Sequence, residues 1–160
     1  MRLNGYEGIP TATLVPEFSP RILRPPDGRL VAAAIRTFAN IAKAWELTGT
    51  DAAKLMGVSR ATYHRLQTTA SREREESPRG KAVLRAGLAD AELQARLSLL
   101  LGISGDLQSY NAKDREYGER WVRQSDSNRV FGGHTPLELM LSGTVVALWT
   151  VRRFTQNMLG

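Results

Sequence analysis

Five polar side chains lie close together between positions 59 and 65: Ser59, Arg60, Thr62, His64 and Arg65. Arginine can pair in a bidentate manner with guanine, and hydroxyl groups can bond to base edges or to phosphate oxygens. The cluster therefore has the chemistry of DNA contact, provided that one structural element presents these side chains on the same side.

The flanking residues predict that this element is the second helix of a helix-turn-helix. Ala53 is small enough to let two helices cross closely, and Gly57, four residues later, has the backbone freedom that a short turn needs. Ser59 is a natural N-cap for the second helix. With Tyr63 and Leu66 facing inward, the polar cluster is left on the outer arc, where a recognition helix meets the major groove. The alternative is a helical hairpin with a solvated basic face.

The charge distribution agrees with contact to a polyanion at this segment. The formal net charge is +6, and residues 29–90 carry eleven basic and six acidic side chains. Residues 91–160 carry eight and seven, and the charges of residues 1–28 cancel. The basic excess thus lies where phosphate neutralisation would need it. Residues 91–160 must serve another purpose, and a nucleoid-type structural protein would need a broader basic surface.

The composition argues against several other classes of protein. The chain has no cysteine, and it lacks a glycine-rich phosphate loop, a paired-histidine zinc motif and a nucleophile elbow. We therefore expect no catalytic residue, metal or cofactor, and a binding protein rather than an enzyme. The N-terminus has no signal pattern, and the longest apolar run, residues 97–103, is too short to span a bilayer. We expect a soluble, cytoplasmic protein.

The N-terminal half should contain one long helix that packs across the helix-turn-helix. Residues 1–28 hold five of the seven prolines and are expected to form a flexible arm. Apolar residues then recur with helical spacing over residues 30–47, with Gly49 as the expected stop. This helix and the helix-turn-helix would make a DNA-binding domain over residues 29–69, followed by a charged linker with a possible short helix over residues 70–89.

Residues 90–160 predict a second, small helical domain, which makes the whole chain all-α. A leucine stripe runs over residues 90–111, and Gly102 and Gly105 suggest a bend within it. Further on, Thr135 can cap a helix that begins at Pro136, and Glu138 completes a capping box.

The last helix, over residues 144–158, has two apolar sides. Ala147, Val151 and Phe154 lie on the side expected to face the core, whereas Val145 and Trp149, with Arg152 and Gln156, project from the opposite side. Either a protein partner or another helix of the same chain could cover that second side.

Read together, these features resemble an antitoxin of the Xre/MbcA/ParS family. Besides the helix-turn-helix, residues 97–111 (LSLLLGISGDLQSYN) are similar to a leucine-rich helix of that family. Residues 120–143 (RWVRQSDSNRVFGGHTPLELMLSG) resemble its hallmark of a tryptophan helix, a loop and a Gly-Gly turn into Pro-Leu-Glu-Leu-Met. The likeness covers residues 30–160 and leaves the arm outside.

The resemblance implies the antitoxin of a type II toxin–antitoxin pair. Its partners would be operator DNA and a RES-domain toxin, which consumes NAD or transfers ADP-ribose from it, and it would form a homodimer. In the family, the C-terminal domain dimerises and covers the toxin, with the C-terminal end near the toxin's substrate pocket. No membrane and no small-molecule substrate are implied. The alternative function is a stand-alone dimeric helix-turn-helix transcriptional regulator.

Carried over to this sequence, the resemblance gives two sets of interface residues. The hallmark turn would shape the toxin-binding domain, and the last helix would offer the dimer or toxin contact. The first set is Gly133, Thr135, Pro136 and Leu137, and the second is Val145, Trp149, Arg152, Arg153, Asn157 and Gly160.

Overall fold

The computed structural model describes residues 28–71 and 76–160. Over these two ranges the chain forms eight helices and no strand, which confirms the all-α expectation. The arm predicted over residues 1–28 lies outside the described residues, apart from Gly28. The helices are α1 (Gly28–Ala44), α2 (Gly49–Met56), α3 (Arg60–Thr69), α4 (Pro78–Leu88), α5 (Ala91–Tyr110), α6 (Tyr117–Val122), α7 (Pro136–Met140) and α8 (Val145–Met158).

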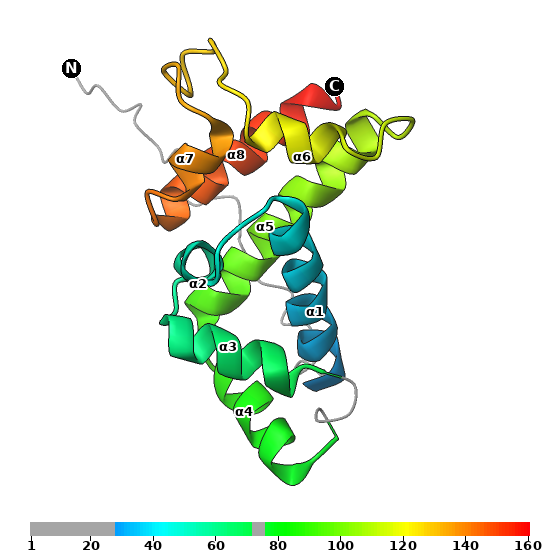
Figure 1. Cartoon of the computed structure of the whole chain (residues 1–160), viewed down its shortest axis with the longest axis vertical. Coiled ribbons are helices and arrows are strands. Elements are labelled where there is room, and N and C mark those ends of the chain that lie inside the picture. The colour runs from blue at the N-terminus through cyan, green and yellow to red at the C-terminus, as the bar shows by residue number, and fades with distance from the viewer. Residues whose placement is uncertain (1–27, 72–75) are drawn as a thin grey trace, which may run out of the picture.

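Helix α5 is shared by two groups of helices (Figure 1). It packs against α1, α2 and α4 of the first group, and against α6 and α8 of the second. Its leucine stripe supplies both contacts: Leu93, Leu97, Leu100, Ile103 and Leu107 are all buried. One continuous hydrophobic core therefore runs along α5 from the helix-turn-helix to the C-terminal helices.

Helix α1 follows the predicted stripe but ends earlier than expected. Its buried face includes Ile35 and Phe38, and the Phe38 ring meets Tyr63 of α3 edge to face, with 6.3 Å between ring centroids. The helix ends at Ala44, and Glu46 takes a left-handed conformation with φ of 53°. The prediction that Gly49 stops α1 was therefore wrong.

Gly49 is instead the first residue of α2. Thr48 and Asp51 form a capping box, in which the Thr48 hydroxyl accepts from the Asp51 N–H at 3.1 Å. A capping box satisfies free N–H groups at the start of a helix, so it outweighs the low helix propensity of glycine.

Residues 78–88, expected to belong to a charged linker, form the packed helix α4. Ser77 caps it by accepting from the Gly80 N–H at 3.0 Å, and Pro78 stands at its first position, where proline is tolerated. Leu84 is fully buried, and α4 packs against α1, α3 and α5. Pro78 and Gly80 both lie in the first turn of this helix.

The bend predicted near Gly102 and Gly105 is also absent, because α5 is unbroken over its 20 residues. Gly102 faces Arg152 of α8 so closely that a Cβ at this position would collide with the guanidinium. A glycine inside a helix costs about 1 kcal/mol, and burial of the leucine stripe outweighs that cost.

Candidate nucleic-acid and partner interfaces

The helix-turn-helix predicted from the sequence is formed by α2 and α3. Gly57 ends α2 in a left-handed conformation, with φ of 70°, which glycine adopts without strain. Ser59 caps α3 by accepting from the Thr62 N–H at 3.1 Å. Ala53, Tyr63 and Leu66 are buried between the helices, as predicted. The local sequence thus determines the path of the chain through the turn.

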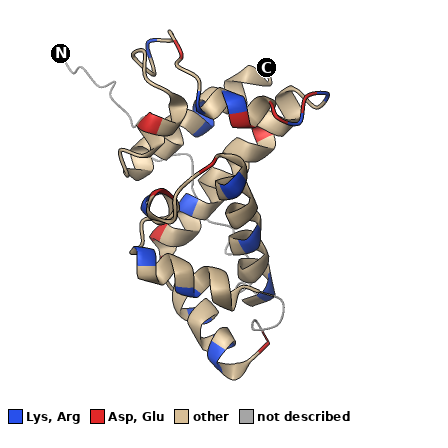
Figure 2. Cartoon of the chain, viewed as in Figure 1, with Lys and Arg blue, Asp and Glu red and all other residues tan. Residues whose placement is uncertain are grey.

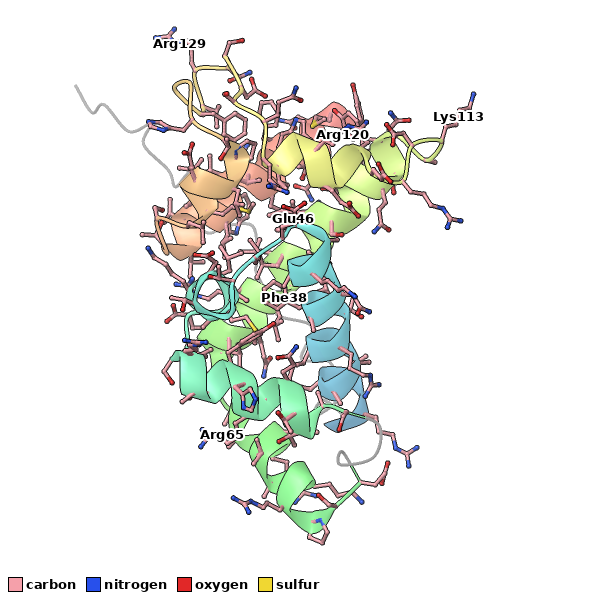
Figure 3. The ribbon with its side chains drawn as sticks, in the orientation of Figure 1. Phe38, Glu46, Arg65, Lys113, Arg120 and Arg129 are labelled. Atoms are coloured by element: carbon pink, nitrogen blue, oxygen red, sulfur yellow. The ribbon has the colours of Figure 1, made fainter. Side chains whose placement is uncertain are left out.

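The predicted DNA-contacting side chains divide into two kinds. The Ser59 hydroxyl donates to the Thr62 hydroxyl at 2.9 Å, so these two side chains are joined to each other within the cap. Arg60, His64 and Arg65 are exposed on the outer arc of α3, and Figure 3 shows Arg65 directed away from the body. These three long side chains extend from the outer arc of α3, whereas Ser59, which is also exposed, is held in the cap.

Helices α3 and α4 together carry a cationic surface (Figure 2). They contain five lysine and arginine residues and no acidic residue, namely Arg60, Arg65, Arg79, Lys81 and Arg85. Beside α4, Glu76 pairs with Arg29 at 3.0 Å and with Lys81 at 3.2 Å. The hydrogen bond with Lys81, helped by the charge of Arg29, lowers the pKa of Glu76. The surface keeps a net positive charge beside the recognition helix.

The glycine-rich turn before α7 has the predicted structure. Gly132 and Gly133 have φ of 57° and 86°, and Thr135 caps α7 in a capping box with Glu138. The N–H of Thr135 donates to the Glu138 carboxylate at 2.7 Å, and this bond is the main cause of the lowered pKa of Glu138. Pro136 is buried and Leu137 is half-buried. These residues build the turn and anchor it to the body.

Three aromatic rings hold the loop before this turn against α8. Phe131 lies 4.9 Å from Phe154 and 5.9 Å from Trp121, measured between ring centroids, with both pairs edge to face. Trp121 stacks on Phe154 at 5.9 Å. Such pairs add about 0.5–1.5 kcal/mol each to the stabilisation from burial. Helices α6 and α8 and the intervening loop therefore form one packed unit.

Helix α8 exposes an apolar face, as the sequence suggested, although its members differ. Val146 is 74% exposed and Trp149 is 41% exposed, whereas Val145 is half-buried. Arg153 stacks over the Trp149 ring, with its guanidinium carbon 5.7 Å from the centroid. We call Val146, Trp149 and Arg153 the α8 face. Their spacing of three and four residues places them in one row along the helix.

The prediction that Arg152 projects outward with Trp149 was wrong. Its guanidinium pairs with Asp106 of α5, a carboxylate that also accepts from the Thr155 hydroxyl at 2.8 Å. Burial lowers the pKa of Arg152. The helix is rotated so that Arg152 faces α5, and Gly102 leaves the room for it. Farther along, Asn157 and Gly160 are exposed near the chain end.

Sequence reasoning missed a buried charge, Arg96 of α5. The residue is only 5% exposed, although it lies in the leucine stripe between Leu93 and Leu97. A single arginine on the apolar side of an amphipathic helix was the available indication, since buried charges need partners.

Neither a metal site nor a membrane span is found in the described part of the chain. It contains no group of three or more histidine, aspartate or glutamate side chains arranged to hold an ion. None of its helices has the length and apolar character needed to cross a bilayer.

The match to a known family falls on the DNA-binding side of the molecule. No curated protein matches the chain. Residues 29–102, which include α1 to α4 and the first part of α5, match the family model for the antitoxin Xre-like helix-turn-helix domain. With the geometry of α2 and α3, this match supports a DNA-binding antitoxin or regulator that carries an Xre-type helix-turn-helix.

Proposed function

We propose that this chain is the antitoxin of a type II toxin–antitoxin pair. It neutralises a RES-type toxin, which consumes NAD or transfers ADP-ribose, and it represses its own operon as a homodimer. The observation that carries the proposal is the exposure of Arg60, His64 and Arg65 on the outer arc of a helix-turn-helix that matches an antitoxin family. The resemblance of residues 120–143 to the hallmark of RES-toxin antitoxins supports the choice of partner.

Operator binding would use the N-terminal end of α3. In this arrangement the first residues of a recognition helix contact base edges, and the preceding helix crosses the phosphate backbone. Arg60 and Arg65 would pair with guanines or phosphates, with His64 between them, while Ser59 and Thr62 hold the start of the helix. A homodimer would place two recognition helices on two half-sites about one helical turn apart.

Toxin binding would use the C-terminal helices. Tryptophan and arginine are the side chains most enriched among residues that dominate binding energy, and the α8 face presents one of each, stacked together. Arg153, Asn157 and Gly160 lie toward the chain end and would reach the toxin. The turn of Gly133, Thr135, Pro136 and Leu137 would fix the position of α8 beneath that contact.

Growth rescue tests the proposal. The product of the adjacent reading frame is expressed alone, with this chain, and with the Trp149→Ala or Arg153→Ala variant. We expect the neighbour to arrest growth, and the wild-type chain to restore growth and co-purify with it. Both variants should rescue poorly while still binding the operator. Lys113→Ala removes one positive charge from the loop between α5 and α6, which holds none of the proposed toxin-binding residues, and it should rescue fully (Figure 3).

Two results would contradict the proposal in different ways. If the product of the adjacent reading frame does not arrest growth and the chain binds its own promoter specifically, the chain is instead a stand-alone dimeric regulator. If the product of the adjacent reading frame is toxic and both Trp149→Ala and Arg153→Ala still neutralise it, the α8 face is not part of the toxin interface.

A further inference from the structure

Arg96 lies where three separate segments of the chain meet. Its Nε and Nη2 groups donate to the Glu92 carboxylate of the same helix at 2.9 and 2.8 Å. Nη1 donates to the carbonyl of Leu55 at 3.3 Å, and Nη2 donates to the carbonyl of Gly143 at 2.8 Å. The two carbonyls belong to segments that are 88 positions apart in the sequence. One guanidinium thus joins α2 to the corner between α7 and α8.

On the α2 side, Arg96 supports the turn of the helix-turn-helix. The carbonyls in the last turn of a helix lack intrahelical partners, and a cation there also complements the helix dipole. The backbone of Gly57 passes directly over the guanidinium, since a Cβ at Gly57 would lie 2.6 Å from Arg96 Nε. Gly57 leads into Ser59, at which the capped recognition helix begins. Arg96 therefore lies beneath the segment that orients α3.

On the other side, Arg96 fixes the corner at which α8 begins. Gly143 has φ of 86°, and its Cα lies against the stem of Lys54, because a Cβ there would be 3.4 Å from Lys54 Cε. Thr144, the next residue, caps α8 by accepting from the Ala147 N–H at 3.1 Å. The corner thus touches α2 through both Lys54 and Arg96.

We propose that Arg96 is a positioning residue that couples operator binding at α3 to the conformation of the α7–α8 corner. The guanidinium is planar, and its donors have a fixed geometry, so it cannot follow one carbonyl without weakening its bond to the other. Contacts that favour one arrangement of α2 and α3 on DNA therefore favour one arrangement of the corner. Because coupling free energies are reciprocal, a partner bound at the C-terminal helices changes operator affinity through the same residue. The inference rests on the proposed DNA-binding function.

Hydrogen exchange on the full chain, with and without a duplex of its own promoter, tests the coupling. The reporters are the amides of Gly143, Ala147 and Leu148, which are hydrogen-bonded at the corner. In the wild-type chain we expect the duplex to slow their exchange at least about fivefold, the lower end of typical coupling. Arg96→Lys keeps the charge but cannot hold both carbonyls in fixed geometry, so it should bind the duplex while losing this protection.

Two further variants keep the test decisive. Arg96→Met removes the donors, and urea unfolding measured beside the exchange shows whether it still folds. Arg129→Met removes one positive charge from the loop between α6 and α7, away from Arg96, and this variant should keep the wild-type protection. Equal protection of the corner in wild-type and Arg96→Lys chains would overturn the coupling, since dimerisation on DNA would then explain it. Absence of protection in a wild-type chain that binds the duplex would also overturn it. A chain that binds no promoter duplex would overturn the proposed function, and the coupling with it.

Discussion

The two ends of this molecule present opposite surfaces. The described part of the chain exposes six large hydrophobic side chains, and five of them, including Val146 and Trp149, lie after residue 109. Helices α2 and α3 contribute none of the six, and the outer arc of α3 carries arginine and histidine instead. Nucleic acid, a strongly hydrated polyanion, is bound by cationic side chains and hydrogen-bond donors. Binding to a protein partner depends more on aromatic side chains that become buried in the interface. The contrast indicates two partners of different chemistry.

The strongest test of this contrast removes the cations of α3. Arg60→Ala together with Arg65→Ala should weaken binding to the promoter by about 2–6 kcal/mol, because each well-placed arginine contributes about 1–3 kcal/mol. Fluorescence anisotropy at two salt concentrations measures the loss, and the salt dependence should become shallower if phosphate contacts are lost. Arg129→Ala serves as the control with a single charge removed. An equal loss in that control would mean that total charge, rather than the α3 surface, governs binding.

Substitutions at two neighbouring residues of α8 test which side of the helix belongs to the core and which is a free surface. Leu148 is fully buried, so Leu148→Ala should lower the free energy of unfolding by about 2–5 kcal/mol. Trp149→Ala should change it by about 1 kcal/mol or less, because substitutions of exposed side chains usually have small effects. Urea unfolding measures both. If Trp149→Ala destabilised the chain as much as Leu148→Ala, the α8 face would be part of the fold and not a free surface.

Substitutions in two helix caps test whether the two ends of the molecule unfold in one transition. Thr48 and Thr135 each complete a capping box, one in each group of helices, and replacing either with alanine should cost about 1 kcal/mol. Because α5 joins the two groups, both variants should shift the same unfolding transition. Two resolved transitions in a thermal melt, each moved by only one variant, would show that the ends fold separately.

The smallest effect concerns the pH dependence of the C-terminal cap. The pKa of Glu138 is lowered in the folded chain, so its carboxylate contributes stability above its unfolded pKa and loses it as pH falls through the folded value. The difference in stability between wild type and Glu138→Gln should thus be largest at neutral pH and shrink in acid. Denaturant unfolding over a pH series measures it. A difference that stayed constant from neutral to acid pH would reject the assignment.

Much of this fold could be predicted because its local signals are strong. The Ser59 cap, the Gly57 turn and the Thr135–Glu138 capping box each specify backbone geometry within four residues. Where the predictions failed, tertiary packing had overridden a local preference. Gly102 and Gly105 suggested a break, but α5 continues because its leucines are buried along the whole length.

The candidate sites were harder to predict than the fold. The exposed residues on the outer arc of α3 followed from elimination of the buried positions, whereas the direction of Arg152 depends on Asp106, which lies 46 positions earlier in the sequence. The role of Arg96 depends likewise on two backbone carbonyls from distant segments. Helical periodicity places a side chain on a face, and only the assembled structure shows what that face meets.

The continuity of α5 limits how this chain can be dissected or recombined. A fragment ending at residue 102, where the family match ends, would stop in the middle of α5 and lose Ile103 and Leu107, which are both fully buried. The remaining C-terminal piece would keep only residues 103–110 of the helix on which α8 packs. The DNA-binding and C-terminal ends are therefore not interchangeable modules. A chimaera that gives this chain a new operator or a new partner must keep a complete α5 matched to both ends.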